Sequence, residues 1–251
     1  MNLEFHYTYL IVAVSFILTG YFSNLIIFTS IIIIHELGHF IIAKELNLKP
    51  TKITIYPFGG ITRTNSLINT PIVKNLLVAI SGILFQSIYF FIIYILYKYG
   101  YIRKYIFDLF ITYHYSILFF NILPIHPLDG SIILNQFLSL YLPYKRTLKI
   151  NVIISILSGI ILLTINYYQF NYTTILLIAI IVNNIIKYYQ NINYLFNKFL
   201  LERYLYKIYF LKRKTIKKID NMYLNKYHII NENNTYLTEK QVLKRRFNRF
   251  L

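Results

Sequence analysis

The sequence has no cysteine, no tryptophan and little negative charge: 9 of its 251 residues are Asp or Glu. Without cysteine, a disulfide-stabilised scaffold and a thiolate metal site are excluded, so a bound metal must be held by His and carboxylates. Charged residues make up 14% of the chain, against about 25% in soluble proteins. A soluble globule cannot bury a chain that is 57% hydrophobic with a mean hydropathy of +0.51, so we interpret it as a membrane protein.

The net charge of +17 is concentrated near the C-terminus, where residues 198–251 contain 14 basic and 4 acidic residues. In a soluble chain this excess would indicate nucleic acid. Here the richness in Ile, Asn, Lys and Tyr is typical of an AT-rich genome, and the basic clusters alternate with Tyr, Phe and Leu. We therefore predict a cytoplasmic tail that lies against an anionic lipid surface, and we expect no nucleic-acid partner.

Windows of about 20 mostly apolar residues predict membrane-spanning helices. Six occur, at Tyr7–Gly20, Asn24–Ala43, Ile72–Tyr97, Ile106–Leu123, Leu148–Ile165 and Tyr172–Ile186. A further stretch, Ser131–Leu142, follows two prolines and is too short to cross alone. The predicted fold class is an all-α polytopic membrane protein with about six transmembrane helices, a short membrane-associated hairpin and a small basic cytoplasmic C-terminal region.

Basic residues also predict the orientation of the chain. With six spans and a cytoplasmic tail, the cytoplasmic segments hold 23 Lys and Arg and the outer loops hold 3. Both termini are then cytoplasmic, with residues 1–190 forming the membrane domain and residues 191–251 the basic tail. The first span lacks a positively charged leader and a small-residue cleavage site, so we expect a retained helix rather than a signal peptide.

Three ionisable residues, His35, Glu36 and His39, lie within the second predicted span. Burying them in an apolar helix costs several kcal/mol, so each is a functional candidate. The two histidines are one helical turn apart on the same face and can bind one metal ion. In such H-E-x-x-H sites, the adjacent carboxylate serves as the general base of a hydrolase.

A catalytic zinc ion needs a third protein ligand and an open position. Two other acidic residues lie near membrane depth. Asp108 begins a span beside a basic loop, which favours an interfacial charge. Asp129 follows the proline-broken segment Asn121–Gly130, where irregular backbone at membrane depth is tolerated only beside protein or a water-filled cavity. We therefore predict Asp129 as the third ligand.

These motifs together resemble the site-2 protease family of intramembrane zinc metalloproteases. Three segments, Tyr56–Gly60, Asn121–Gly130 and Leu200–Tyr204, further resemble the stage IV sporulation protein FB group of that family. The resemblance implies one zinc ion per chain held by His35, His39 and Asp129, with Glu36 as the catalytic base. It also implies that Asn121 positions the substrate, and that Pro57, Phe58, Gly59 and Gly60 belong to a membrane-inserted hairpin that receives it.

The implied partners are a membrane-tethered substrate, such as a pro-sigma factor whose pro-sequence is removed, and membrane inhibitor proteins. A membrane anti-sigma factor is an alternative substrate. Two other classes stay open: a non-proteolytic zinc-binding membrane protein, and a basic membrane-surface adaptor. Glu36 favours a hydrolase over a non-proteolytic zinc-binding protein, because a metal carrier needs no general base. A membrane-surface adaptor would leave the buried His35–His39 motif unexplained.

The sequence departs from the group at three places. Ser81-Gly82-Ile83 lacks the usual proline, although Gly82 and Gln86 keep a close helix-packing pattern with one polar residue. His126 replaces an aromatic residue, and we interpret it as a filler rather than a ligand. The tail is too short for the group's nucleotide-sensing CBS domain; it predicts a reduced remnant, a strand-turn-strand over 227–237 and a basic helix. We expect His6, His114 and His228 to be structural.

Overall fold

The computed structural model describes residues 2–57, 59–165, 172–232 and 235–248. The chain forms two compact units, residues 1–66 with 76–122 and residues 67–75 with 123–251. The described residues are mostly helical, with eight α-helices and two three-stranded sheets. The expectation of an all-α chain is therefore wrong in one respect, because six short strands among the described residues pair into the two sheets.

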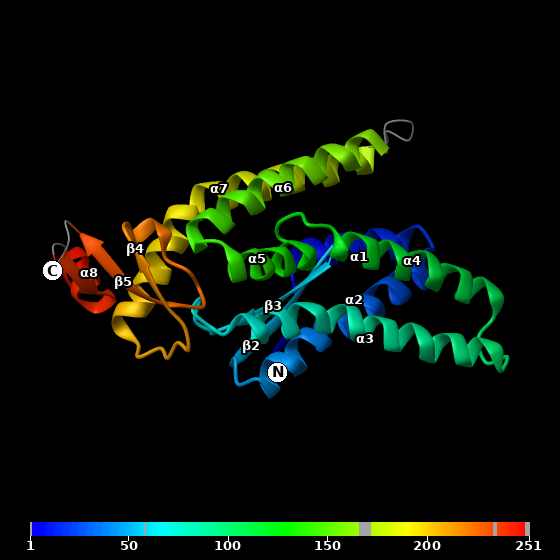
Figure 1. The fold of residues 1–251 in the computed structure, drawn as a ribbon. Helices are drawn as coiled ribbons and strands as arrows, with labels where there is room; N and C mark the ends of the chain where they lie inside the picture. Colours follow the sequence, from blue (N-terminus) through cyan, green and yellow to red (C-terminus); the bar gives the residue numbers. More distant parts are fainter. Residues whose placement is uncertain (1, 58, 166–171, 233–234, 249–251) are drawn as a thin grey trace. The chain divides into compact units, whose positions relative to one another are not determined.

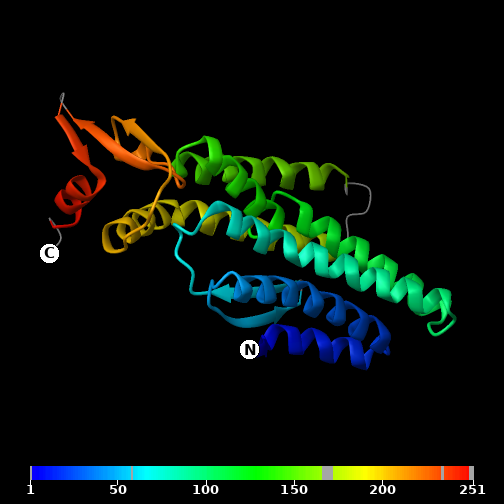
Figure 2. The ribbon, with the colours of Figure 1, turned by 60° about the horizontal axis from the view of Figure 1, so that its bottom comes forward.

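The first unit surrounds one small sheet with helices. Its elements are β1 (Asn2–Phe5), α1 (Tyr7–Leu18), α2 (Phe22–Glu45), β2 (Pro50–Tyr56), β3 (Gly59–Thr64), most of α3 (Ile72–Lys98) and α4 (Lys104–Ile122). The strand β2 pairs in parallel with β1 and antiparallel with β3. Figure 2 shows α2 lying along the β2–β3 hairpin.

Burial of one face of β2 joins this sheet to the helices. Ile53 and Ile55 point to the same side because strand side chains alternate, and both are fully buried. They pack with Tyr9, Ile32 and Phe40. A hairpin is present near Pro57, as we expected, in the form of β2–β3. Its pairing with β1 joins residues about 50 positions apart in the sequence, and we did not predict it.

The second unit is a helical bundle followed by a small mixed domain. Its elements are α5 (Asp129–Tyr141), α6 (Tyr144–Ile165), α7 (Tyr172–Leu205), β4 (Arg213–Ile216), the 3₁₀ turn η2 (Ile219–Asn221), β5 (Tyr227–Glu232), β6 (Thr235–Thr238) and α8 (Glu239–Phe247). The helices α6 and α7 lie side by side (Figure 1). The antiparallel pair β5–β6 and the basic helix α8 confirm the predicted tail elements, but the turn at residues 233–234 lies outside the described residues.

Among the described residues, three helices are long and apolar enough to cross a membrane, against the six spans predicted: α2, α3 and α6, the last over Tyr144–Thr164. The predicted first span forms the apolar helix α1, which has 12 residues and is shorter than a full crossing. At 1.5 Å per residue it extends about 18 Å, against a hydrocarbon core of about 30 Å. Within the described residues, the chain is therefore a multi-pass membrane protein.

A buried arginine near the end of α7 joins this helix to the C-terminal sheet. Burial lowers the pKa of Arg203 to about 10, which still leaves it a cation at neutral pH. It donates to five oxygens: Asn69 Oδ1, Glu239 Oε1 and the carbonyls of Tyr223, Leu224 and Lys226, at 2.6–3.0 Å. Glu239 Oε1 also accepts from the backbone N–H of His228 at 2.6 Å. A fully bonded cation thus fixes the C-terminal domain.

We predict that Arg203→Met destabilises the C-terminal domain by about 3–5 kcal/mol, because it leaves the Glu239 carboxylate buried without its cation. Hydrogen–deuterium exchange of β5 across a urea series measures the free energy of opening. The control is Arg213→Met, which removes an exposed arginine at the start of β4 and should change this free energy by less than about 0.5 kcal/mol. Equal protection of β5 in the two variants would show that Arg203 does not stabilise the domain.

Candidate metal centre

The helix α2 carries three buried ionisable side chains at one level. His35, Glu36 and His39 are 3%, 5% and 7% exposed, and their ligand atoms lie within 4.8 Å of one another. The two histidine Nε2 atoms are 3.1 Å apart. The one-turn spacing predicted from the sequence therefore brings both imidazoles to one point.

The other nitrogen of each imidazole is bonded to α3. His39 Nδ1 donates to the Val78 carbonyl at 2.7 Å, and His35 Nδ1 lies 3.1 Å from Gln86 Oε1. Gln86 Nε2 donates to the His114 carbonyl at 2.9 Å, which turns the amide oxygen toward His35. Both Nδ1 atoms therefore hold a proton, and both Nε2 atoms present a lone pair to the same point. Two facing lone pairs repel each other unless a cation lies between them.

The face of α3 that meets these imidazoles has no side chain at Gly82, one turn from both Val78 and Gln86. A Cβ at this position would lie less than 3 Å from Nε2 of both His35 and His39. The spacing of Gly82 and Gln86, which we interpreted as a helix-packing pattern, thus also leaves room beside the two imidazoles. Glycine keeps open the space that the two lone pairs face.

The carboxylate of Glu36 is held by the strand β3. Thr62 Oγ1 donates to Glu36 Oε2 at 2.7 Å. Two residues earlier on the same face of the strand, a Cβ at Gly60 would overlap the Glu36 side chain, and would lie 2.7 Å from its Cδ. A hydroxyl and a missing side chain therefore fix one carboxylate oxygen and leave the group beside the two histidines.

This donor set fits a zinc ion. Zinc binds neutral imidazole nitrogen at about 2.0–2.1 Å, so two histidines of a tetrahedral site have nitrogens about 3.3 Å apart. The observed separation of 3.1 Å is close to that value. In zinc sites, the ring nitrogen that does not bind the metal donates a hydrogen bond that orients the imidazole. The Nδ1 atoms of His35 and His39 make hydrogen bonds of this kind.

The other predicted site residues lie elsewhere in the chain. Asp129 is the first residue of α5, in the second unit, and Asn121 lies in the last turn of α4. Pro57 and Gly59 lie at the tip of the β2–β3 hairpin, where Gly59 has a φ of +151° that favours glycine. Phe58 lies outside the described residues. The roles of these residues stay predictions.

The remaining histidines mostly have the structural roles we expected. His6 caps α1 by accepting from the Thr8 N–H, and His228 accepts from the Tyr223 N–H at 3.0 Å. His126 stacks on Tyr188, with ring centroids 3.9 Å apart. His114 differs, because it orients Gln86, which bonds to the candidate ligand His35.

Sequence reasoning missed Thr62 and the roles of Gln86 and His114 at the site. Gln86 gave a signal, since a glutamine in the middle of an apolar span needs a partner. Thr62 gave none, because a threonine in an exposed-looking segment is ordinary. Its contact with Glu36 is visible only once β3 is placed against α2.

Comparisons with known proteins agree with this site. Residues 23–104 match the model of peptidase family M50. The chain is 30% identical over 218 residues to stage IV sporulation protein FB of Bacillus subtilis (strain 168), covering 85% of this chain and 76% of that protein. It is 28% identical over 159 residues to a zinc metalloprotease of Methanocaldococcus jannaschii, covering 59% of this chain and 46% of that protein.

A solved structure supports the same fold. The site-2 protease from Methanocaldococcus jannaschii superposes with a TM-score of 0.59 at 24% identity, covering 74% of this chain and 89% of that chain. With the buried His-Glu-His group suited to a metal ion, these likenesses confirm the predicted enzyme class. The chain belongs to peptidase family M50, the site-2 proteases, and is an intramembrane zinc metalloprotease.

Proposed function

We propose that the chain hydrolyses a peptide bond of a membrane-tethered pro-sigma factor, with His35, His39 and Asp129 as zinc ligands and Glu36 as the general base. One observation carries the proposal: the Glu36 carboxylate is fixed by Thr62 beside two imidazoles that both present Nε2 lone pairs. Zinc bound there supplies Lewis-acid chemistry, which polarises a carbonyl and makes water nucleophilic at neutral pH.

The residues of the chain perform the proton transfers. Glu36 takes a proton from the attacking water while that water adds to the scissile carbonyl carbon. The same carboxyl then gives the proton to the leaving nitrogen as the C–N bond breaks, so the net reaction is addition of one water. Thr62 keeps one oxygen of Glu36 bonded throughout, which directs the other oxygen toward the water.

The charge distribution of the chain supports a cytoplasmic location of both termini. The parallel pair β1–β2 places residues 2–5 beside residues 52–55, so the N-terminus lies on the same side as the basic segment 44–74. Within the second unit, Asn69 accepts a hydrogen bond from Arg203, which anchors the tail. We propose that six segments cross or enter the membrane and that the N-terminal strand and the tail are both cytoplasmic, in agreement with the positive-inside rule.

This orientation sets how the substrate reaches the site. His39 lies five residues before Lys44 in α2, which is about 8 Å along the helix from the basic boundary. Water and an unwound substrate segment would arrive from the cytoplasm, past the Pro57–Gly60 hairpin tip, because a helical segment hides its carbonyls in its own hydrogen bonds. A cytoplasmic product fits a transcription factor freed from its pro-sequence. Membrane inhibitor proteins and anionic lipids at α8 are the further partners that we propose.

Gly82→Ala should lower zinc occupancy, because the added methyl group would lie less than 3 Å from both Nε2 atoms and displace the imidazoles. Zinc per chain is measured by elemental analysis of protein purified in detergent, with helix content from circular dichroism. Gly159→Ala on α6 is the matched control, since a Cβ there meets nothing within 4 Å. Full zinc occupancy in the Gly82 variant would place the metal away from these histidines.

Glu36→Gln should keep zinc but slow cleavage by about 10²–10⁴-fold, because it removes the general base and preserves the shape of the side chain. Zinc content and cleavage of a membrane-tethered pro-sigma-factor reporter are measured on the same preparation. Asp129→Ala provides the contrast, since loss of a ligand should remove both zinc and cleavage. Normal turnover by the Glu36 variant would disprove the mechanism.

Single cysteines in this cysteine-free chain test the orientation. Tyr101 and Tyr209 are 79% and 92% exposed, and they lie in the proposed outer loop and in the tail. We expect a membrane-impermeant thiol reagent to label Tyr101→Cys on intact cells, and to label Tyr209→Cys only after the cells are broken. The reverse pattern would invert the topology.

A further inference from the structure

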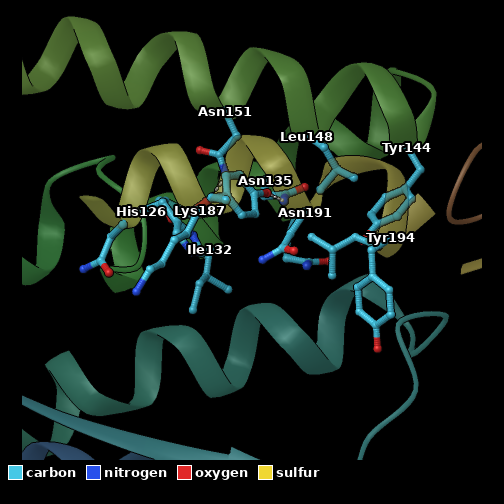
Figure 3. A pocket seen from close by; sticks show the side chains of 14 residues that line it. His126, Ile132, Asn135, Tyr144, Leu148, Asn151, Lys187, Asn191 and Tyr194 are labelled. Atoms are coloured by element: carbon cyan, nitrogen blue, oxygen red, sulfur yellow. Dashed lines mark hydrogen bonds between the residues drawn. The ribbon is translucent and has the colours of Figure 1, made fainter. Parts of the chain in front are cut away.

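A polar cavity of about 470 Å³ lies among α5, α6 and α7 of the second unit. Its size is within the range of ligand-binding sites, about 300–1,000 Å³. In Figure 3, Asn151 and Leu148 on α6 point toward Asn135 on α5 and Asn191 on α7. The mechanism proposed above uses none of these four side chains.

The lining is unusually polar for a chain that is 57% hydrophobic. Five of the described lining residues are carboxamides, namely Asn135, Gln136, Asn151, Asn184 and Asn191. Among the described lining residues there is one cation, the exposed Lys187, and there is no carboxylate. The cavity therefore suits a neutral ligand with many hydrogen-bonding groups, rather than a metal ion or a polyanion.

Three side-chain atoms of this lining are buried without a hydrogen-bond partner in the protein: Ser131 Oγ, Gln136 Oε1 and Asn151 Oδ1. Ser131 and Asn151 are each 1% exposed. An unpaired buried polar atom costs about 1–3 kcal/mol, and nearly all such atoms in folded proteins are paired. Two of the three are amide oxygens, which accept hydrogen bonds and cannot donate them, so the missing partner must carry N–H or O–H groups.

We infer that this cavity binds an unwound stretch of the polypeptide substrate and recognises its backbone. An extended peptide offers alternating N–H donors and C=O acceptors, and a carboxamide side chain presents the same donor and acceptor pair. Asn135 Nδ2 donates to the Tyr188 hydroxyl at 3.2 Å, so part of the lining is already held in place. The unpaired oxygens of Gln136 and Asn151 are covered in this structure, and they receive backbone N–H groups once their side chains turn toward the cavity.

The inference rests on the proposed function, because Asp129 marks the position of the scissile bond. The helix α5 begins at Asp129, and Asn135 lies six residues farther along it, a distance of about 9 Å. An extended chain advances about 3.3 Å per residue. The cavity therefore contacts substrate residues about three positions from the scissile bond.

Disulfide trapping tests occupancy without requiring catalysis. The full chain carries Glu36→Gln and one cysteine, either Ile132→Cys in the cavity lining or Phe137→Cys on the same helix outside it. The probe is a pro-sigma-factor reporter that the parent chain cleaves, with single cysteines placed two to five residues from the cut. We expect Ile132→Cys to cross-link best about three residues from the cut and Phe137→Cys not to cross-link. Equal or absent cross-linking at both positions would overturn the inference.

Kinetics of the active chain give a second test. Gln136→Met keeps the length of the side chain and removes the open acceptor, so KM should rise about tenfold with kcat and zinc content unchanged. Phe137→Met is the matched control and should leave KM unchanged. If Lys187→Met raises KM and Gln136→Met does not, the cavity binds an anionic lipid headgroup and the inference is wrong.

The two tests separate this inference from the proposed function. Cross-linking at Ile132 together with full cleavage by Glu36→Gln would disprove the catalytic mechanism and leave the binding site standing. Loss of cleavage in Glu36→Gln with no cross-linking at Ile132 would support the mechanism and disprove the binding site.

Discussion

The structure of the first unit depends on one requirement: two neutral imidazoles must present Nε2 lone pairs to the same point inside an apolar helical bundle. Only the bonds of the opposite nitrogens can enforce this, because a free imidazole exchanges its proton between the two atoms. One face of α3 supplies both partners, the Val78 carbonyl and the Gln86 amide. The approach of α2 and α3 must therefore be close. It is close at Gly38 as well, where a Cβ would lie 2.6 Å from the Ser81 carbonyl oxygen.

The small sheet orients the Glu36 carboxylate in this arrangement. A carboxylate beside a metal needs a hydrogen-bond donor to fix its orientation, and the apolar helices around Glu36 have few to offer. The strand β3, which lies along α2, brings Thr62 to one oxygen of Glu36 and leaves Gly60 without a side chain in the way. The pairing of β1 with β2 then holds the strand against the helix, since Ile53 and Ile55 share their core with α1 and α2.

Sequence reasoning reached the features that are encoded locally. A five-residue motif on one helix face placed His35, Glu36 and His39, and apolar windows found the helices, because both signals lie within a few turns of chain. The hydrogen-bond partners of these residues could not be predicted from the sequence, for a physical reason. Gln86 lies 51 residues from His35, and Thr62 lies 26 residues from Glu36, so their contacts exist only after tertiary packing. The strand β1 was missed because its four residues pair with a strand about 50 positions away.

Buried polar groups in this chain differ in how completely they are bonded, and among the described residues Thr54, Glu202 and Asn225 also hold unpaired oxygens outside the cavity. Around His35 and Glu36 the orienting groups Gln86 and Thr62 have partners, which in the proposed mechanism hold the reacting groups in one orientation and avoid a reorganisation cost. Arg203 is bonded just as completely, and its role is rigidity. In the cavity among α5, α6 and α7, by contrast, Gln136 and Asn151 keep open acceptors. A site that binds a ligand must leave bonds unmade until the ligand arrives, and the open acceptors of Gln136 and Asn151 meet this requirement in the proposed substrate cavity.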